Sequence, residues 1–179
     1  MYKNKKILFI VISILILIVI IGVFIFLRLK NKNSSDVLFS SNQELSIEIP
    51  KKLKLEQIQN PNYILYLQSN NLRIRVSKIN RFLNKSLEKI IEADKETYLK
   101  NFQNYNNVSD IIHLEINGYN SYMYTFDFTT TSPNIILSSK NIAIEQNDVI
   151  YMIDFTVNSA FIQNSNEIIN EILLSLKIY

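Results

Sequence analysis

The fold of this chain is decided by residues 112–128, which read IHLEINGYNSYMYTFDF. Before the Asn-Gly pair at 117–118, apolar side chains recur at every second position, at Ile112, Leu114 and Ile116. After the pair they recur again, at Tyr122, Tyr124, Phe126 and Phe128. Alternation with a period of two is typical of a strand with one buried face, and Asn-Gly favours the positive φ angles of a tight turn. The stretch therefore predicts an antiparallel hairpin.

Further strands are expected on both sides of this hairpin. Leu45, Ile47 and Ile49 alternate with polar residues, and Pro50 ends that strand. Other alternating runs are separated by turns at residues 69–71 and 146–148. The expected strands cover residues 45–50, 63–68, 72–79, 135–145 and 149–157, with a short one starting at Leu53. Their expected core positions are Leu72, Ile74, Val76, Val149, Tyr151, Ile153, Phe155 and Val157.

Two stretches carry the helical period of three and four residues. Ser86 is placed to cap the first helix, and Asn164 with Glu167 forms a capping box for the last. The apolar residues are Leu87, Ile90, Ile91, Tyr98, Leu99 and Phe102 in the first helix and Ile168, Ile169, Ile172, Leu173 and Leu176 in the last. The order of elements predicts an α+β fold, with a single antiparallel sheet and two helices packed on one face.

The N-terminal part of the chain predicts one transmembrane helix. An uncharged apolar run begins at Ile7 and ends at Leu27. At a rise of 1.5 Å per residue the run spans roughly 32 Å, close to the hydrocarbon thickness of about 30 Å. A cleavable signal peptide, a lipoprotein anchor and a pilin stem are disfavoured, because no Ala precedes Ala93, no Cys is present and the first acidic residue is Asp36. A buried core helix would need polar interruptions. We therefore expect Ile7 to Leu27 to contact the lipid bilayer.

The expected orientation places the N-terminus in the cytoplasm, because translocating a short tail with three lysines is unfavourable. The positive charges on the two sides are nearly balanced, with Lys3, Lys5 and Lys6 before the helix and Arg28, Lys30 and Lys32 after it. The expected division is a cytoplasmic tail (residues 1–6), the transmembrane helix (7–27), a linker (28–44) and one extracytoplasmic domain (45–179).

The charge of the domain disfavours nucleic acid as a partner. The chain has 19 Lys and Arg against 16 Asp and Glu, but six of the basic residues flank the membrane helix. From residue 33 onward the count is 13 basic against 16 acidic residues, a net charge of −3. A nucleic-acid-binding face is expected to be basic.

No catalytic or cofactor motif stands out in the sequence. His113 is the only His, so a His-rich metal site is excluded, and by alternation its side chain is expected on the solvent face of its strand. The two Gly, at positions 22 and 118, are too far apart for a phosphate-binding loop. Glu88, Glu92 and Glu96 share a helical stripe but are interleaved with lysines, which indicates a solvated face. We predict no enzyme activity, no cofactor and no metal site.

One set of polar residues is a candidate binding surface. The expected sheet face opposite the helices carries Arg73, Arg75, His113, Glu115, Thr125, Asp127, Met152, Asp154 and Thr156. The simpler interpretation is an exposed face with cross-strand ion pairs, each worth roughly 0.2 to 1 kcal/mol. The functional hypothesis makes the face a docking surface for another envelope protein, with Arg73, Arg75, Asp127 and Asp154 as contacts.

Four features together resemble the PsbP-like and DcrB-like family over residues 45–179. They are LSIEIP at residues 45–50, the helix after Ser86, INGY at residues 116–119 and ILLSLKI at residues 172–178. The resemblance implies an exported, membrane-anchored protein that acts as an accessory or assembly subunit. It implies no catalytic residues.

Two functional hypotheses follow from the sequence. The first is a membrane-anchored extracytoplasmic binding or assembly module without catalytic activity, located in the cell membrane and contacting an envelope protein. The alternative is a cell-envelope hydrolase or small-ligand sensor whose site uses Asp, Glu and Tyr residues; the ten Tyr of the chain leave room for such a pocket.

Overall fold

A computed structural model describes residues 36–41, 44–80, 85–101, 104–130, 135–158, 160 and 165–179. From Val37 onward the chain forms one compact unit that ends at Tyr179. The predicted membrane helix, residues 7–27, lies outside the described residues. Among the helices of the described part, none combines the length and the apolar character that crossing a membrane requires.

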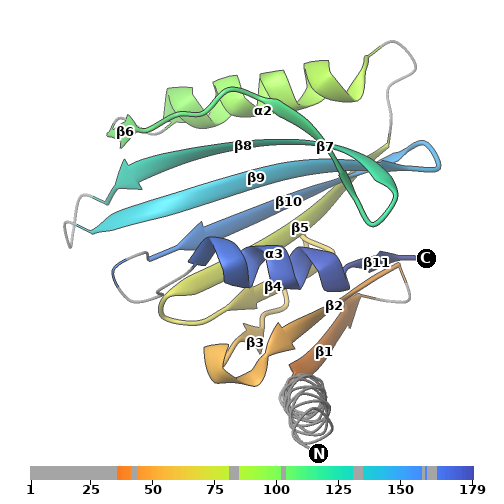
Figure 1. Cartoon of the computed structure of the whole chain (residues 1–179), viewed down its shortest axis with the longest axis vertical. Helices are drawn as coiled ribbons and strands as arrows, with labels where there is room; N and C mark the ends of the chain where they lie inside the picture. Colours follow the sequence, from red (N-terminus) through yellow and green to blue (C-terminus); the bar gives the residue numbers. More distant parts are fainter. Residues whose placement is uncertain are drawn as a thin grey trace, which may run out of the picture. The chain divides into compact units, whose positions relative to one another are not determined.

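A large antiparallel sheet forms the centre of the domain (Figure 1). Its strand order is β3-β4-β5-β10-β9-β8-β6, and β7 also pairs with β8. The strands are β3 (Glu56–Gln57), β4 (Leu65–Gln68), β5 (Leu72–Asn80), β6 (Tyr105–Asn106), β7 (Ile112–Ile116), β8 (Tyr119–Thr129), β9 (Ile136–Gln146) and β10 (Val149–Val157). The central strands are those that the period-two alternation predicts.

A second, three-stranded sheet contradicts the prediction of a single sheet. Its order is β1-β2-β11, formed by β1 (Asp36–Ser41), β2 (Leu45–Pro50) and β11 (Lys177–Ile178). The strand β1 lies inside the stretch that the sequence analysis assigned to a linker. The two-residue strand β11 is too short to show alternation, and it forms because Lys177 and Ile178 pair with Ser46 and Leu45. A short 3-10 helix, η1 (Lys51–Leu53), follows β2 and includes Leu53, where a short strand was expected to start.

Two helices are described, α2 (Leu87–Asn101) and α3 (Ser165–Ser175), and both agree with the helical periods of the sequence. The Ser86 Oγ accepts a hydrogen bond of 3.3 Å from the backbone N–H of Lys89, which confirms the predicted cap of α2. Asn164, the predicted cap of α3, lies outside the described residues.

The hairpin at Asn117 and Gly118 forms as predicted, with φ angles of 52° and 84°. Its register pairs Ile116 with Tyr119 across the two-residue turn. The turn also holds α3 in place, because the Asn117 amide donates hydrogen bonds to the carbonyl oxygens of Leu173 (3.1 Å) and Leu176 (2.9 Å). These carbonyls lie at and just after the C-terminal end of α3, where backbone oxygens lack the N–H partners of a continuing helix.

The two helices cover opposite faces of the large sheet, so the prediction that both pack on one face is wrong. Register decides this, because Phe126 lies opposite Ser139, and Ser139 lies opposite Thr156. The aromatic face of β8 therefore continues into the polar side chains of β10. The apolar side chains of β10, such as Phe155, point to the other face.

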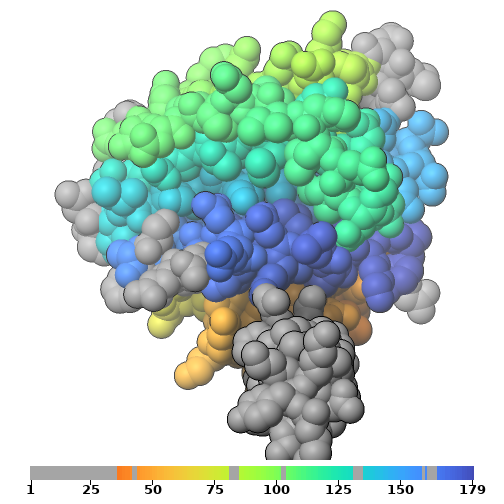
Figure 2. Space-filling model, in the orientation of Figure 1, coloured from red at the N-terminus to blue at the C-terminus, as the bar shows by residue number. Residues whose placement is uncertain are grey.

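Each face of the large sheet has its own core. The first contains α3, the small sheet and the apolar face of β10, with members such as Leu45, Ile74, Ile153, Phe155, Ile172 and Ile178. The second contains α2 and the aromatic face of β8, with members Leu87, Ile91, Tyr124, Phe126, Phe128, Ala143 and Ile150. Figure 2 shows α3, in blue, on the surface of the face that carries the first core.

Candidate functional site

A row of polar side chains crosses the large sheet beneath α2. Tyr124 of β8 pairs with Asn141 of β9, which pairs with Asp154 of β10, which pairs with Arg75 of β5. Residues directly opposite each other on antiparallel strands present their side chains on the same face. All four side chains therefore point toward α2.

The centre of this row is an ion pair between Arg75 and Asp154. Only 18% of the Arg75 side chain and 11% of the Asp154 side chain are exposed. Thr156 Oγ1 donates to the Asp154 Oδ1 at 3.0 Å, and Arg73 Nη2 donates to that same hydroxyl at 3.0 Å. On the other side, Arg75 Nη1 donates to the Tyr63 hydroxyl at 3.2 Å. The pair is held by neighbours on β5, on β10 and in the segment before β4.

Helix α2 adds two polar side chains to the row. The Tyr98 hydroxyl donates to the Asp154 Oδ2 at 3.0 Å and accepts from Arg75 Nη2 at 3.0 Å. One turn earlier, Asp94 accepts a hydrogen bond of 2.8 Å from the Tyr124 hydroxyl. We call Arg75, Asp94, Tyr98, Tyr124 and Asp154 the buried polar cluster.

A cavity of about 110 Å³ lies beside this cluster. It is lined by Tyr63, Arg75, Ser77, Ile79, Asp94, Tyr98, Asn141, Met152, Ile153 and Asp154. Sites for small organic ligands usually measure about 300 to 1,000 Å³. The cavity corresponds to roughly three or four water molecules, each with a share of liquid volume of about 30 Å³.

Burial controls the protonation of the cluster. Burial raises the pKa of Asp94 above its ordinary value; the Tyr124 hydrogen bond opposes that rise, and the nearby Asp154 carboxylate adds to it. Burial also raises the pKa values of Tyr98 and Tyr124, and the neighbouring carboxylates add to both shifts. Burial alone lowers the pKa of Arg75, but the attraction of Asp154 outweighs it, so the pKa of Arg75 is raised. Both tyrosines stay neutral donors and Arg75 stays charged.

We expect the variant Asp94→Asn to gain stability relative to the wild type as the pH rises. Because the folded pKa of Asp94 is raised, its favourable contribution is complete below the unfolded value near 3.8 and is lost as the pH rises through the folded pKa. Asn keeps an acceptor for the Tyr124 hydroxyl but carries no charge. The measurement is the free energy of unfolding of both proteins at pH 4 and pH 7.

The control for this experiment is Glu92→Gln, which removes a charge from the exposed side of the same helix. A free energy of unfolding of Asp94→Asn that falls relative to that of the wild type from pH 4 to pH 7 would contradict the burial of the Asp94 carboxyl group.

The structure brings together only part of the predicted binding face. Arg73, Arg75 and Asp154 share one network, but α2 covers it, so this part of the sheet is not an open surface. Asp127 lies on the other face, opposite Ser138, and accepts a hydrogen bond of 2.7 Å from Asn107 Nδ2. The prediction of one face carrying all four residues is therefore wrong. A docking role for each residue stays a prediction.

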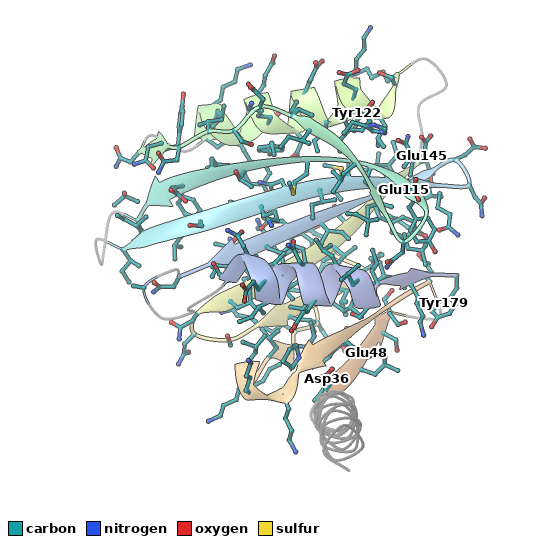
Figure 3. The ribbon with its side chains drawn as sticks, in the orientation of Figure 1. Asp36, Glu48, Glu115, Tyr122, Glu145 and Tyr179 are labelled. Carbon is teal, nitrogen blue, oxygen red and sulfur yellow. The ribbon has the colours of Figure 1, made fainter. Side chains whose placement is uncertain are left out.

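His113 and Glu115, two other residues of the predicted face, lie on β7. The His113 ring packs on the Tyr122 ring with a centroid distance of 4.8 Å, and its Nε2 lies 2.8 Å from the Asn120 Oδ1. Asn120 Nδ2 donates to the Glu145 Oε2 at 3.3 Å. Figure 3 labels Tyr122, Glu115 and Glu145 in this region. His113 is exposed, as alternation predicts, and its ring contacts side chains of β8.

Asp94 is the cluster member that sequence reasoning missed. It follows Ile91 by three residues and precedes Tyr98 by four, so it lies on the apolar stripe of its helix. An ionisable residue on the apolar stripe of a helix is the sequence feature that could have indicated a buried polar contact here. Among the described residues, no group of three or more His, Asp or Glu is arranged to hold a metal ion.

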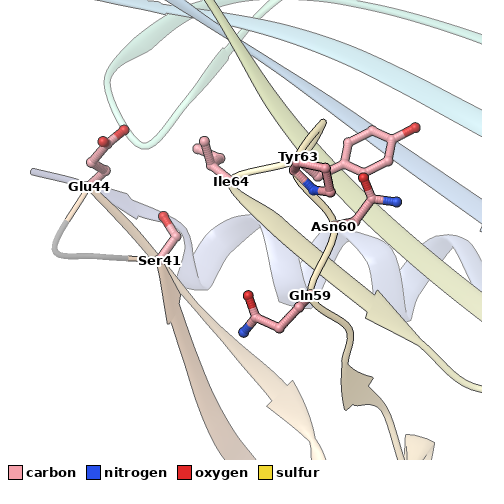
Figure 4. Close-up of a pocket in the computed structure, with 7 residues that line it drawn as sticks. Ser41, Glu44, Gln59, Asn60, Tyr63 and Ile64 are labelled. Atoms are coloured by element: carbon pink, nitrogen blue, oxygen red, sulfur yellow. The ribbon is translucent and has the colours of Figure 1, made fainter.

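A larger, open groove of about 490 Å³ lies between the small sheet and the segment that joins β3 to β4 (Figure 4). Its lining residues are Ser41, Glu44, Gln59, Asn60, Pro61, Tyr63 and Ile64. We call this the β1–β3 groove. Figure 4 shows the Ser41 hydroxyl directed toward the space between Glu44 and Ile64, and the Tyr63 ring directed away from Ser41.

Glu44 borders the groove but is neutralised. Its two carboxylate oxygens accept hydrogen bonds of 2.9 Å and 2.8 Å from the Lys78 Nζ on β5. This contact raises the pKa of Lys78, first through the hydrogen bond. Because the described residues that line the groove include no other acidic or basic side chain, its electrostatic character is neutral and polar.

The fold is similar to several solved structures. Cyanobacterial PsbP (CyanoP) from Synechocystis sp. PCC 6803 aligns with a TM-score of 0.55 and 7% identity, over 82% of this chain and 94% of that one. LpqN of Mycobacterium tuberculosis, described as involved in cell envelope biogenesis, aligns with a TM-score of 0.53 and 11% identity, over 83% and 93%.

A third structure is PA94 of Pseudomonas aeruginosa, a protein of unknown function for which a regulatory role has been suggested. It has a TM-score of 0.53 and 10% identity, over 82% of this chain and 99% of that one. At identities this low, the similarity establishes the fold alone. The structural alignments with PsbP and LpqN confirm the predicted PsbP-like fold. No protein-family model matches the chain, and no curated protein matches it in sequence.

Proposed function

We propose that this protein is a membrane-anchored extracytoplasmic binding or assembly module without catalytic activity. The observation that supports the proposal is the difference between the cavity under α2 and the β1–β3 groove. The buried polar cluster lies beside a cavity of about 110 Å³ and its members bond to one another, whereas the groove of about 490 Å³ is neutral. A groove of that size is within the range of ligand sites, roughly 300 to 1,000 Å³.

The alternative is a hydrolase or small-ligand sensor that works with Asp, Glu and Tyr residues. Asp94 and Asp154 are the carboxylates that such an activity would use. The Asp154 carboxylate already accepts from Arg75, Tyr98 and Thr156, which favours a structural role. A substrate would also need more space than the cavity beside them offers. We therefore favour the binding module.

The location in this proposal rests on the apolar run from Ile7 to Leu27, which we assign to a single membrane-spanning helix. The domain would then lie outside the cytoplasm, as the three lysines before the run favour. The fold shared with LpqN, which is described as involved in cell envelope biogenesis, supports an envelope role. Membership in the PsbP-like and DcrB-like family is part of the same proposal.

Crosslinking on spheroplasts tests this function. An amine-reactive crosslinker that does not pass membranes should react with the exposed lysines of the domain, such as Lys51, Lys89 and Lys177. We expect mass spectrometry to identify reproducible crosslinks from these lysines to one envelope protein. The matched control is the same reaction after lysis, when every lysine is accessible.

Two results would count against the proposal. Lysines that react only after lysis would place the domain in the cytoplasm. Lysines that react on intact spheroplasts but give no intermolecular crosslink would contradict the assembly role.

A further inference from the structure

The β1–β3 groove contains a buried polar atom that a ligand can satisfy. Ser41 is 6% exposed, and its Oγ has no hydrogen-bond partner among the described residues. A buried hydroxyl without a partner costs roughly 1 to 3 kcal/mol. Ser41 lines the groove, and in Figure 4 its hydroxyl is directed toward the space between Glu44 and Ile64.

The second polar side chain directed into the groove is Gln59. It is exposed, and Figure 4 shows its amide turned toward the β1 side. An amide both donates and accepts, so it matches the alternating N–H and C=O groups of a peptide backbone. Asn60 is turned away, and its Oδ1 accepts from the backbone N–H of Asn62 at 3.0 Å.

The electrostatics of the groove select an uncharged ligand. The Glu44 carboxylate is occupied by Lys78, and both side chains remain partly exposed, at 38% and 41%. A charged ligand would have to compete with this contact and would gain little from the other lining residues. Pro61 and Ile64 offer apolar contact to a small side chain.

The described lining residues offer no unoccupied aromatic ring on which a sugar could stack. Tyr63 is the aromatic residue there, but its ring is already engaged by the Arg75 guanidinium, 5.5 Å from the ring centroid, and by the edge of Tyr66. Figure 4 shows that this ring points away from Ser41. The observations therefore favour a peptide over a saccharide.

The groove also lies beside the outer strands of both sheets. Ser41 ends β1, the outer strand of the small sheet, and Gln59 follows β3, the outer strand of the large one. Within the described residues, β1 and β3 each have one edge without a strand partner. Unpaired edges of this kind accept an extended peptide through main-chain hydrogen bonds.

We infer that the β1–β3 groove binds an extended, uncharged peptide segment of a partner protein. The segment bonds to the Ser41 hydroxyl and the Gln59 amide, and it lies along the edge of β1. This inference rests on the proposed binding function and names its ligand class.

The test uses a display library of random ten-residue peptides and the full chain in lipid nanodiscs, with empty nanodiscs for counter-selection. We expect the selected peptides to be uncharged. Their affinity should fall roughly 2- to 12-fold in Ser41→Ala, the loss of one hydrogen bond. Gln59→Trp, which fills the groove, should abolish binding. Asn170→Trp, on the exposed side of α3, should leave it unchanged.

Ser41→Ala also separates binding from folding. Because the hydroxyl has no hydrogen-bond partner in the described part of the chain, its removal should not lower the melting temperature. A folded variant with weaker peptide binding supports the inference. A library that yields no peptide, or peptides insensitive to Ser41→Ala and Gln59→Trp, overturns it.

The same variants are tested against N-acetylated chito-oligosaccharides. Saccharide binding that Gln59→Trp abolishes would overturn the peptide assignment. Crosslinks to an envelope protein that persist in Gln59→Trp would leave the binding module standing and reject only its location in the groove.

Discussion

Asp154→Ala is expected to lower the free energy of unfolding by about 3 to 5 kcal/mol. The change leaves the Arg75 guanidinium buried opposite an apolar methyl group, and the loss of one partner of a buried ion pair exposes the full desolvation cost of the other. It also removes the acceptor of Tyr98 and of Thr156. Urea denaturation of the detergent-solubilised chain, followed by Tyr fluorescence, measures the loss; the chain has ten Tyr and no Trp.

The matched control is Glu96→Ala on α2. Glu96 pairs with Lys100 at 3.9 Å, and both side chains are more than two-thirds exposed. An exposed pair contributes at most about 1 kcal/mol, so the control should be nearly neutral. The double variant Arg75→Met, Asp154→Leu should recover much of the lost stability, because no unpaired charge remains. A loss in Asp154→Ala as small as in Glu96→Ala would contradict the burial of the pair.

Ile172→Ala is expected to cost about 2 to 5 kcal/mol. Ile172 is 1% exposed and belongs to the core that α3 forms with the small sheet and the apolar face of β10. Truncation removes apolar burial and leaves a cavity that the surrounding sheets can fill only in part. The measurement is the same urea titration, with the denaturant dependence checked for a constant slope.

Leu174→Ala is the control on the same helix, two residues away. Leu174 is 71% exposed, so its truncation should change stability by less than about 0.5 kcal/mol. Equal losses at both positions would mean that α3 does not present the Ile172 side to the large sheet. The pair of variants therefore tests which side of α3 packs into the core.

The buried polar cluster includes Arg75 and Asp154, two residues that the sequence analysis assigned to a docking surface. Arg75 and Asp154 were predicted as docking contacts on an open face, yet each is held by several partners beneath α2. Charged residues in such a network act on stability and on the choice of register. The surface that we propose for a partner is instead the groove near Ser41, whose lining the sequence pattern did not single out.

Local periodicity by itself determined most elements of this protein. The hairpin around Asn117, the strands β5 and β10 and the helix after Ser86 follow from side-chain alternation, turn residues and a cap, all of which act over a few neighbouring residues. The sequence also predicts a membrane helix from Ile7 to Leu27, which stays a prediction.

Only the tertiary structure decided how these elements combine. Alternation fixes which side chains of a strand share a face, but pairing between distant strands decides which faces join, and a shift of one residue exchanges them. The Phe126 side chain therefore lies on the same face of the sheet as Thr156, and Phe155 lies on the opposite face. The small sheet, the contact of Asp94 with Tyr124 and the groove beside Ser41 depend in the same way on segments far apart in the chain, whose meeting no local pattern encodes.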